Sequence, residues 1–268
     1  MILPIEWRSS LELDRGLTEQ VTLPRMSHIR EHLNSVAMDI IYYQSPLYRT
    51  EIITGVARCL NETYAKFMRN NPDFNGPVSI LAHSLGSVIV YDILTQWTPF
   101  RIYDEYVSQA VNLYCQKERT TEEERLLLDT LRESREAIDK CAGLMDKVLV
   151  GEDSRLQFSV KNLFCIGSPL AVFIIMRGGT YRSAIPPKEQ VERIFNIFHP
   201  YDPIAYRLEP LFHEKYRYVR PLKVYIHGHE FTKSYDDLDY TLHRAAKKRI
   251  KKEKGTSAKV GELVHFIV

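Results

Sequence analysis

Residues 78–94 read Val78-Ser-Ile-Leu-Ala-His-Ser84-Leu-Gly-Ser-Val-Ile-Val-Tyr-Asp-Ile-Leu94. An apolar, β-branched run leads into Ala-His-Ser-Leu-Gly, and a helix-like apolar segment follows directly. This order is typical of a sharp strand-to-helix turn that lifts a serine hydroxyl above the edge of a sheet. Such a turn holds Ser84 at positive φ, so small residues are expected two positions away, where Ala82 and Gly86 stand. We predict a nucleophile elbow; the alternative is an ordinary Ser-Gly turn with His83 packed beneath it.

The segment after Ser84 also suggests the chemistry. The beginning of a helix points backbone N–H groups toward the place where a negatively charged oxygen forms during acyl transfer. We therefore predict that the Leu85 N–H helps to hold this oxyanion. A serine hydroxyl needs a histidine to take its proton and a carboxylate to orient that histidine. The motif favours a serine hydrolase in which an acidic residue and then a histidine follow Ser84 along the chain.

Strand-like and helix-like segments alternate along the 268 residues, which predicts an α/β fold. We expect an α/β-hydrolase-like arrangement, with a mostly parallel sheet flanked by helices, in one domain over residues 1–268. Beyond the serine turn, strands are expected at residues 160–166, 193–198 and 222–226. Helices are expected at residues 28–43, 47–70 and 85–97.

A long helical insertion is expected at residues 121–149, after the nucleophile helix. Thr121-Glu-Glu-Glu124 has the pattern of a capping box. One face of the segment is apolar and the opposite face is densely charged; the apolar residues are Leu127, Leu131, Ile138, Ala142, Met145 and Leu149. Two interpretations stay open, a lid over the active-site mouth and a solvated outer helix.

Asp202 is the candidate carboxylate, because it follows an expected strand and stands between two prolines, Pro200 and Pro203. The alternative is that Asp202 merely caps the turn at Pro203. Five histidines follow Asp202 along the chain, and those considered as the base are His229, His243 and His265. His229 is the candidate base, since it comes after an expected strand and the flexible Gly228.

Charge is unevenly distributed, although the net charge is only +2. Residues 244–254 hold seven Lys or Arg and one Glu, so the rest of the chain is mildly acidic. This basic run suits attraction to an anionic lipid surface; a solvated tail or a nuclear-localisation patch is the alternative. No aromatic residue interrupts the run, which argues against nucleic-acid recognition.

Cysteine usage and hydropathy predict a cytoplasmic protein that meets membranes peripherally. The four cysteines show no metal-ligand spacing, which favours a reducing compartment. The first residues have no signal-peptide pattern, and the longest apolar run, residues 170–176, is too short to span a bilayer. The sequence leaves the oligomeric state open.

The chain resembles the DDHD-domain family of intracellular phospholipases, the phosphatidic acid-preferring phospholipase A1 group. The matching stretches are Pro4-Ile-Glu-Trp-Arg8, Leu33-Asn-Ser-Val-Ala-Met-Asp-Ile-Ile-Tyr-Tyr43, Ser45-Pro-Leu-Tyr48, His83-Ser-Leu-Gly86, Asn162-Leu-Phe-Cys-Ile-Gly-Ser-Pro-Leu-Ala-Val-Phe173, Phe195-Asn-Ile-Phe-His-Pro-Tyr-Asp-Pro-Ile-Ala-Tyr-Arg-Leu-Glu-Pro210 and Leu238-Asp-Tyr-Thr-Leu242. They cover most of the chain up to about residue 243, and residues 155–268 correspond to the DDHD-domain portion.

The resemblance implies roles for particular residues. Ser84 falls on the family's nucleophile, and Asp202 and Asp239 fall on the first two of the four residues that name the domain. The family suggests either catalytic partners or a divalent-metal site for these aspartates, although two aspartates alone make a weak metal site. No cofactor is otherwise required.

The resemblance also implies a substrate and a departure from the family. It implies hydrolysis of the acyl ester of an acidic glycerophospholipid such as phosphatidic acid, taken from a membrane surface. Family members have an upstream strand ending in His-Gly, and they continue past the Asp-Tyr motif to a histidine and a final aspartate. We therefore expect a chain truncated at both ends. The alternative function is a non-catalytic protein that binds lipid or a partner in membrane trafficking.

Overall fold

The computed structural model describes residues 1–11, 13, 17–21, 38–99, 106–111, 113, 121–141, 152–178, 186, 188–212, 216–217, 220–225, 228 and 230. Its strands are β1 (Ser79–His83), β2 (Val160–Ile166) and β3 (Val191–Ile197). Its α-helices are α1 (Leu17–Val21), α3 (Asp39–Gln44), α4 (Pro46–Asn70), α5 (Leu85–Thr95), α7 (Glu122–Lys140), α9 (Leu170–Met176) and α10 (Glu209–Phe212). Two short 3-10 helices are η1 (Arg8–Ser10) and η3 (Glu152–Ser154).

The described residues belong to two compact units. One unit comprises residues 1–74 and 92–158, and the other comprises residues 75–91 and 159–268. The second unit contains the sheet, the beginning of α5, and helices α9 and α10. It therefore holds Ser84 and Asp202 together.

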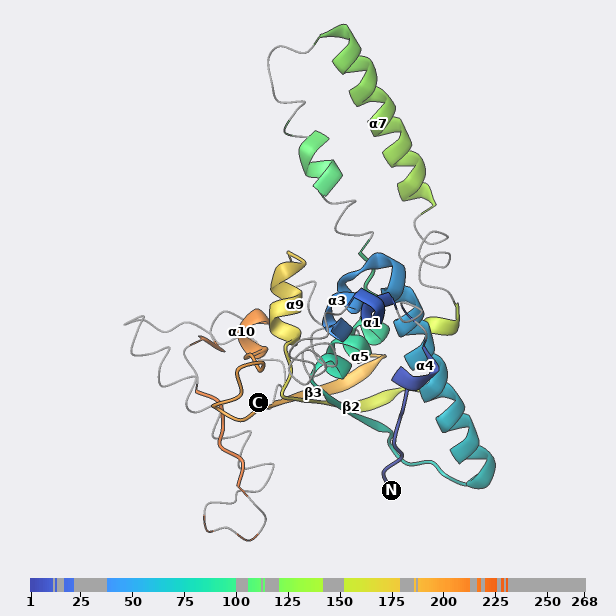
Figure 1. The fold of residues 1–268 in the computed structure, drawn as a ribbon, viewed down its shortest axis with the longest axis vertical. Coiled ribbons are helices and arrows are strands. Elements are labelled where there is room, and N and C mark those ends of the chain that lie inside the picture. Colours follow the sequence, from blue (N-terminus) through green and yellow to red (C-terminus); the bar gives the residue numbers. More distant parts are fainter. Residues whose placement is uncertain are drawn as a thin grey trace. The chain divides into compact units, whose positions relative to one another are not determined.

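Within the described residues, the sheet has three parallel strands in the order β1-β2-β3 (Figure 1). Ala82 pairs with Cys165 in the middle strand, and Cys165 in turn pairs with Asn196. These three side chains and their neighbours two positions earlier, Ile80, Leu163 and Ile194, are buried and share one face of the sheet. On the opposite face, the rings of Phe164 and Phe195 stack with their centroids 4.6 Å apart. The predicted α/β class with a parallel sheet and helices is confirmed.

Helix α4 forms as the four-residue spacing of its apolar residues predicts. Ile52, Val56 and Leu60 are buried, and the Tyr64 ring lies 4.5 Å from the ring of Phe158. The helix begins with Pro46, which suits the first helical position because its missing N–H has no partner there in any case. Residues 22–37 lie outside the described residues, and they include the first part of the helix expected at 28–43.

Helix α7 confirms the capping box. The Thr121 N–H donates to Glu124 Oε2 (2.8 Å), and the Glu124 N–H donates to Thr121 Oγ1 (3.3 Å). Of the described leucines of this helix, Leu126, Leu127 and Leu131 are exposed, and Leu128 is half-buried. The expected continuation over residues 142–149 lies outside the described residues, and the choice between lid and outer helix stays a prediction.

The strand expected at 222–226 does not form over residues 222–225, which the structure describes without strand pairing. Val224 is exposed, and Lys223 and Tyr225 beside it are exposed as well. The prediction was wrong for these residues, because an apolar run becomes a strand only where a neighbouring strand offers its edge.

Candidate active site

Ser84 occupies the turn between β1 and α5 and is, with Gln96, one of two described non-glycine residues at positive φ. Its φ is +50°, a conformation that costs energy for a residue with a side chain. The Ser84 N–H donates to the carbonyl of Ile166 at the end of β2 (2.9 Å). The Ser84 carbonyl accepts the Ser87 N–H (3.1 Å). The predicted strand-to-helix turn with a serine at positive φ is confirmed.

The small residues on either side of Ser84 fit the turn differently. Ala82 is buried in β1. A Cβ added to Gly86, by contrast, would meet no atom within 4 Å outside its own helix. The described neighbours therefore do not impose a small residue at position 86, and the expectation for position 82 stays a prediction.

Leu85 is the first residue of α5, directly after Ser84. Its N–H is among the first four of the helix, which have no hydrogen-bond partner inside an α-helix. The Leu85 side chain is buried, which ties the start of the helix to the apolar interior. This residue therefore has the backbone position that an oxyanion donor needs, and its role stays a prediction.

Asp202 lies on the loop after β3, at the same end of the parallel sheet as the Ser84 turn. Its N–H donates to the carbonyl of His199 (3.0 Å), and its Oδ1 accepts the N–H of Ile204 (2.9 Å). The second bond spans Pro203, so Asp202 does cap the turn, as the alternative interpretation proposed. This leaves the second carboxylate oxygen for another partner.

That second oxygen faces Gly167, the residue that follows the middle strand β2. Gly167 has φ +55°, and a Cβ built on it would lie 2.9 Å from Asp202 Oδ2 and 3.6 Å from His83 Nε2. Asp202, from the loop after β3, and His83, the last residue of β1, thus both lie close to the glycine that follows the central strand. The alternative interpretation of the serine turn, with His83 packed beneath it, does not fit, because His83 is exposed.

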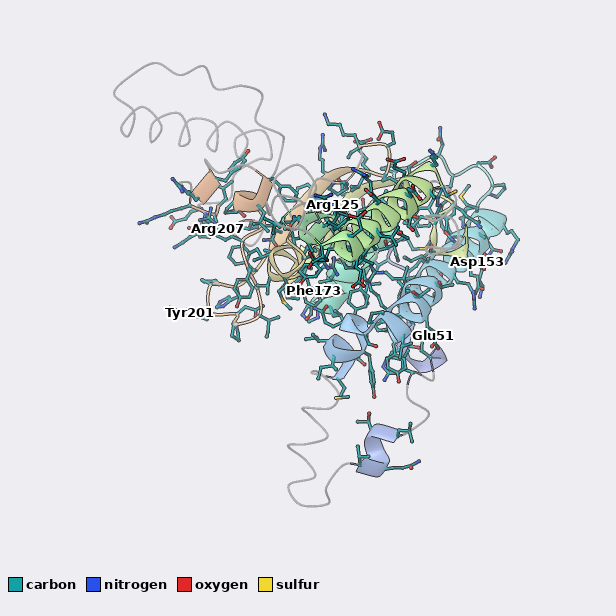
Figure 2. The ribbon with its side chains drawn as sticks, turned by 90° about the horizontal axis from the view of Figure 1, so that it is seen from above. Glu51, Arg125, Asp153, Phe173, Tyr201 and Arg207 are labelled. Atoms are coloured by element: carbon teal, nitrogen blue, oxygen red, sulfur yellow. The ribbon has the colours of Figure 1, made fainter. Side chains whose placement is uncertain are left out.

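His199 and Tyr201 belong to the same loop as Asp202. The Tyr201 N–H donates to His199 Nδ1 (3.3 Å). The two rings are in contact, with centroids 5.6 Å apart. Tyr201 is 88% exposed and stands at the outside of the loop (Figure 2).

The structure adds two serines that the sequence analysis did not single out. Ser87 and Ser168 are buried, and their hydroxyls are hydrogen-bonded to one another. They come from α5 and from the segment between β2 and α9, 81 residues apart. A serine inside an apolar helix and a Gly-Ser-Pro after a strand were the available signals, and neither indicates a partner.

The remaining candidates fall outside the described residues. These are Asp239, the histidines His229, His243 and His265, and the basic run 244–254. Among the residues that are described, no group of three or more His, Cys, Asp and Glu side chains is suited to hold a metal ion. Asp239, the second residue of the expected metal site, lies outside the described residues, so the metal site stays a prediction.

No helix in the described part of the chain is both long and apolar enough to cross a lipid bilayer.

Comparison with known proteins identifies the C-terminal part of the chain. Residues 156–264 match the DDHD domain. The chain is 48% identical to "Intracellular phospholipase A1" of Caenorhabditis elegans over 255 residues, which is 94% of this chain and 30% of that protein. It is 43% identical to "Phospholipase DDHD1" of Homo sapiens over 234 residues, 83% of this chain and 26% of that protein.

A third relative is named for a different substrate. "Triacylglycerol hydrolase DDHD2" of Mus musculus is 29% identical over 276 residues, with 78% of this chain and 39% of that protein covered. The chain therefore spans well under half the length of these curated relatives. No solved structure matches the chain.

Proposed function

The chain belongs to the DDHD-domain family, and from this premise we propose that it is a serine hydrolase acting on the acyl ester of glycerophospholipids such as phosphatidic acid. One observation carries the proposal. Ser84 stands at positive φ between a parallel strand and a helix, and Asp202 follows the third strand at the same end of the sheet. A strained serine turn beside a carboxylate is what nucleophilic acyl transfer requires.

The proposed fold is α/β-hydrolase-like. The serine follows β1 and the acid follows β3, which agrees with the chain order of nucleophile, acid and base in that fold. Parallel strands bring loops distant in sequence to one edge, where Asp202 Oδ2 and His83 Nε2 approach the same glycine. His229, further along the chain, is the proposed base.

In the proposed reaction, Ser84 Oγ attacks the acyl carbonyl carbon while its proton passes to the histidine base. The carbonyl oxygen becomes an oxyanion and accepts a hydrogen bond from the Leu85 N–H. The bond from carbonyl carbon to glycerol oxygen then breaks, and the base returns the proton to that oxygen. Water, deprotonated by the same base, cleaves the acyl-serine ester and releases the fatty acid.

In this proposal Asp202 orients the histidine base. The protein is proposed to work in the cytoplasm at a membrane surface. Its acidic substrate would be drawn by the basic run at residues 244–254. The phospholipase names of two relatives support a phospholipid ester, and the triacylglycerol hydrolase name of the third supports testing a neutral lipid beside it. The proposed steps require no metal.

The test measures fatty-acid release from phosphatidic acid vesicles and from a triacylglycerol emulsion. We expect Ser84→Ala to lower release at least about 10³-fold, because the nucleophile is lost. Ser159→Ala is the matched control, since Ser159 is an exposed serine just before β2. Circular dichroism verifies that each variant is folded. Equal release by wild type and Ser84→Ala would contradict the proposal. Preferential release from the emulsion would show that the substrate is a triacylglycerol and not a glycerophospholipid.

The same proteins discriminate the alternative, a non-catalytic lipid- or partner-binding chain. A fluorophosphonate probe labels a serine that its site has activated. We expect labelling of the wild type and of Ser159→Ala, and none of Ser84→Ala. A folded wild type that is neither labelled nor active supports the binding function instead.

A further inference from the structure

Two buried hydroxyls lie against the Ser84 turn, and the proposed reaction does not use either. Ser87 is 0% exposed and Ser168 is 1% exposed. A hydroxyl taken from water into the interior costs free energy unless it is hydrogen-bonded, so both groups need partners there.

The direction of each hydrogen bond follows from the chemistry of the partners. The Ser84 carbonyl can only accept, so the Ser87 hydroxyl donates to it (2.5 Å). Ser87 has thereby used its one proton, and the bond between Ser87 Oγ and Ser168 Oγ must be donated by Ser168. Ser168 Oγ in turn accepts the N–H of Leu170 at the beginning of α9 (3.1 Å). A directed chain thus runs from Leu170 through Ser168 and Ser87 to the Ser84 carbonyl.

This chain ends on the peptide group that also carries the Leu85 N–H. In a trans peptide the carbonyl and the N–H lie in one plane and point in opposite directions. A donor that holds the Ser84 carbonyl on one side therefore fixes where the Leu85 N–H points on the other. Donation to the carbonyl also polarises the amide, which makes its N–H a stronger donor.

Other contacts hold the same turn from both sides. The Ser84 N–H is bonded to the Ile166 carbonyl (2.9 Å), so the peptide before Ser84 is anchored to β2. The Ser168 carbonyl accepts the Tyr206 N–H (3.1 Å), which connects Ser168 to the segment after Asp202. Ser168 is thus itself anchored where the loops after β2 and β3 meet.

We propose that Ser87 and Ser168 are positioning residues that aim the Leu85 N–H at the oxyanion formed on Ser84. The inference rests on the proposed hydrolase function, because the oxyanion forms only if Ser84 is the nucleophile. Ser87 acts on the peptide directly, and Ser168 acts through Ser87. Their effect falls on the transition state, where the oxyanion exists, and not on substrate binding.

The experiment measures kcat and KM of the full chain on a soluble short-chain p-nitrophenyl ester, normalised to the serine labelled by a fluorophosphonate. We expect Ser87→Ala to lower kcat about 10- to 100-fold with KM within about twofold, since small misplacements at the reacting centre have effects of this size. Ser168→Ala should lower kcat roughly tenfold, again with little change in KM. Ser154→Ala is the matched control. It removes another fully buried hydroxyl, in the compact unit that does not contain Ser84, and should leave kcat unchanged.

The double variant gives the decisive readout. If Ser168 acts through Ser87, then Ser168→Ala made in the Ser87→Ala background has no further effect on kcat. Ser168→Cys keeps the size of the side chain but donates weakly, so its kcat should lie between those of wild type and Ser168→Ala; it also serves if Ser168→Ala does not fold. An inactive wild type would refute the hydrolase function itself. An active wild type with unchanged kcat in Ser168→Ala, or with additive losses in the double variant, would overturn the positioning role alone.

Discussion

At the scale of single residues, the site depends on two positive φ angles at neighbouring strand ends. Ser84 (φ +50°) directly follows β1, and Gly167 (φ +55°) directly follows β2. The strain at Ser84 lies on a residue with a side chain, which is typical of functional sites. Gly167 accepts its conformation without strain and leaves room for Asp202 Oδ2.

Gly167→Ala is expected to impair both stability and the site. The new Cβ would stand 2.9 Å from Asp202 Oδ2 and would adopt a strained φ, so we expect a loss of roughly 1–3 kcal/mol in the free energy of unfolding. Displacement of Asp202 should also lower ester hydrolysis. Urea unfolding and the release assay measure the two effects.

Gly178→Ala separates strain from contact in that experiment. Gly178 has φ +66°, and a Cβ there would meet nothing within 4 Å. We expect this variant to lose stability through strain alone and to keep its activity. If Gly167→Ala hydrolyses the ester as well as Gly178→Ala does, the approach of Asp202 to Gly167 has no catalytic meaning.

At the scale of elements, a buried ion pair joins α4 to α5. Arg49 Nη2 donates to Asp92 Oδ2 (2.8 Å) and to the Trp97 carbonyl (2.9 Å), and the Tyr43 hydroxyl donates to the same carboxylate oxygen. The two charged side chains are 7% and 0% exposed. The Arg49 guanidinium also lies over the Trp97 ring, 4.6 Å from its centroid. Arg49 therefore compensates a charge that would otherwise be buried alone.

Removing one partner of this pair should be costly. We expect Arg49→Ala or Asp92→Ala to lower the free energy of unfolding by roughly 3–5 kcal/mol, because each leaves the other charge buried without compensation. The double variant Arg49→Met with Asp92→Leu should lose less than either single variant. Denaturant unfolding provides the measurement.

The exposed pair Arg132–Asp129 on α7 is the control for that comparison. Its side chains are 68% and 58% exposed, so solvent screens the attraction. Asp129→Ala should change the midpoint of unfolding little. An equal loss of unfolding free energy in Asp129→Ala and Asp92→Ala would show that burial of an ion pair does not determine its contribution to stability.

At the scale of the whole molecule, the family match and the compact units divide the chain differently. The DDHD match covers residues 156–264 and so includes β2, β3 and Asp202. The compact unit that contains these elements also includes residues 75–91, which supply β1 and Ser84. The candidate site therefore draws on both sides of the boundary of the match.

Global stability should fall in alkaline solution because of Cys165 in the central strand. Burial raises the pKa of this thiol from 9.0 to about 12. Above pH 9 the unfolded chain releases the thiol proton and the folded chain retains it, so the free energy of unfolding falls as the pH rises. The contribution of the protonated Cys165 thiol to the free energy of unfolding is complete below pH 9. It is lost between pH 9 and about 12, at up to about 1.4 kcal/mol per pH unit.

The check is the free energy of unfolding of wild type and Cys165→Ala between pH 7 and 11. Other groups titrate in this range in both proteins, so the difference between the two curves isolates the thiol. We expect the difference to be constant up to about pH 8 and to shrink above pH 9, as wild type loses its advantage. A constant difference across the range would contradict the prediction.

The sequence by itself determined the local elements. The Ser84 turn, α4, β2 and the capping box of α7 follow from apolar spacing, strand-to-helix order and side chains that bond backbone groups a few residues away. These patterns act between near neighbours, where backbone sterics and hydrogen bonding leave few conformations.

The tertiary structure alone decided which distant groups meet. Asp202 and His83 both lie close to Gly167, and Ser168 donates to Ser87 across 81 residues of chain, because parallel pairing brings the ends of β1, β2 and β3 to one edge. Over residues 222–225 the expected strand does not form for the same reason, since a strand requires a partner edge that its own residues do not encode. Periodicity identifies an element, and packing chooses its neighbours.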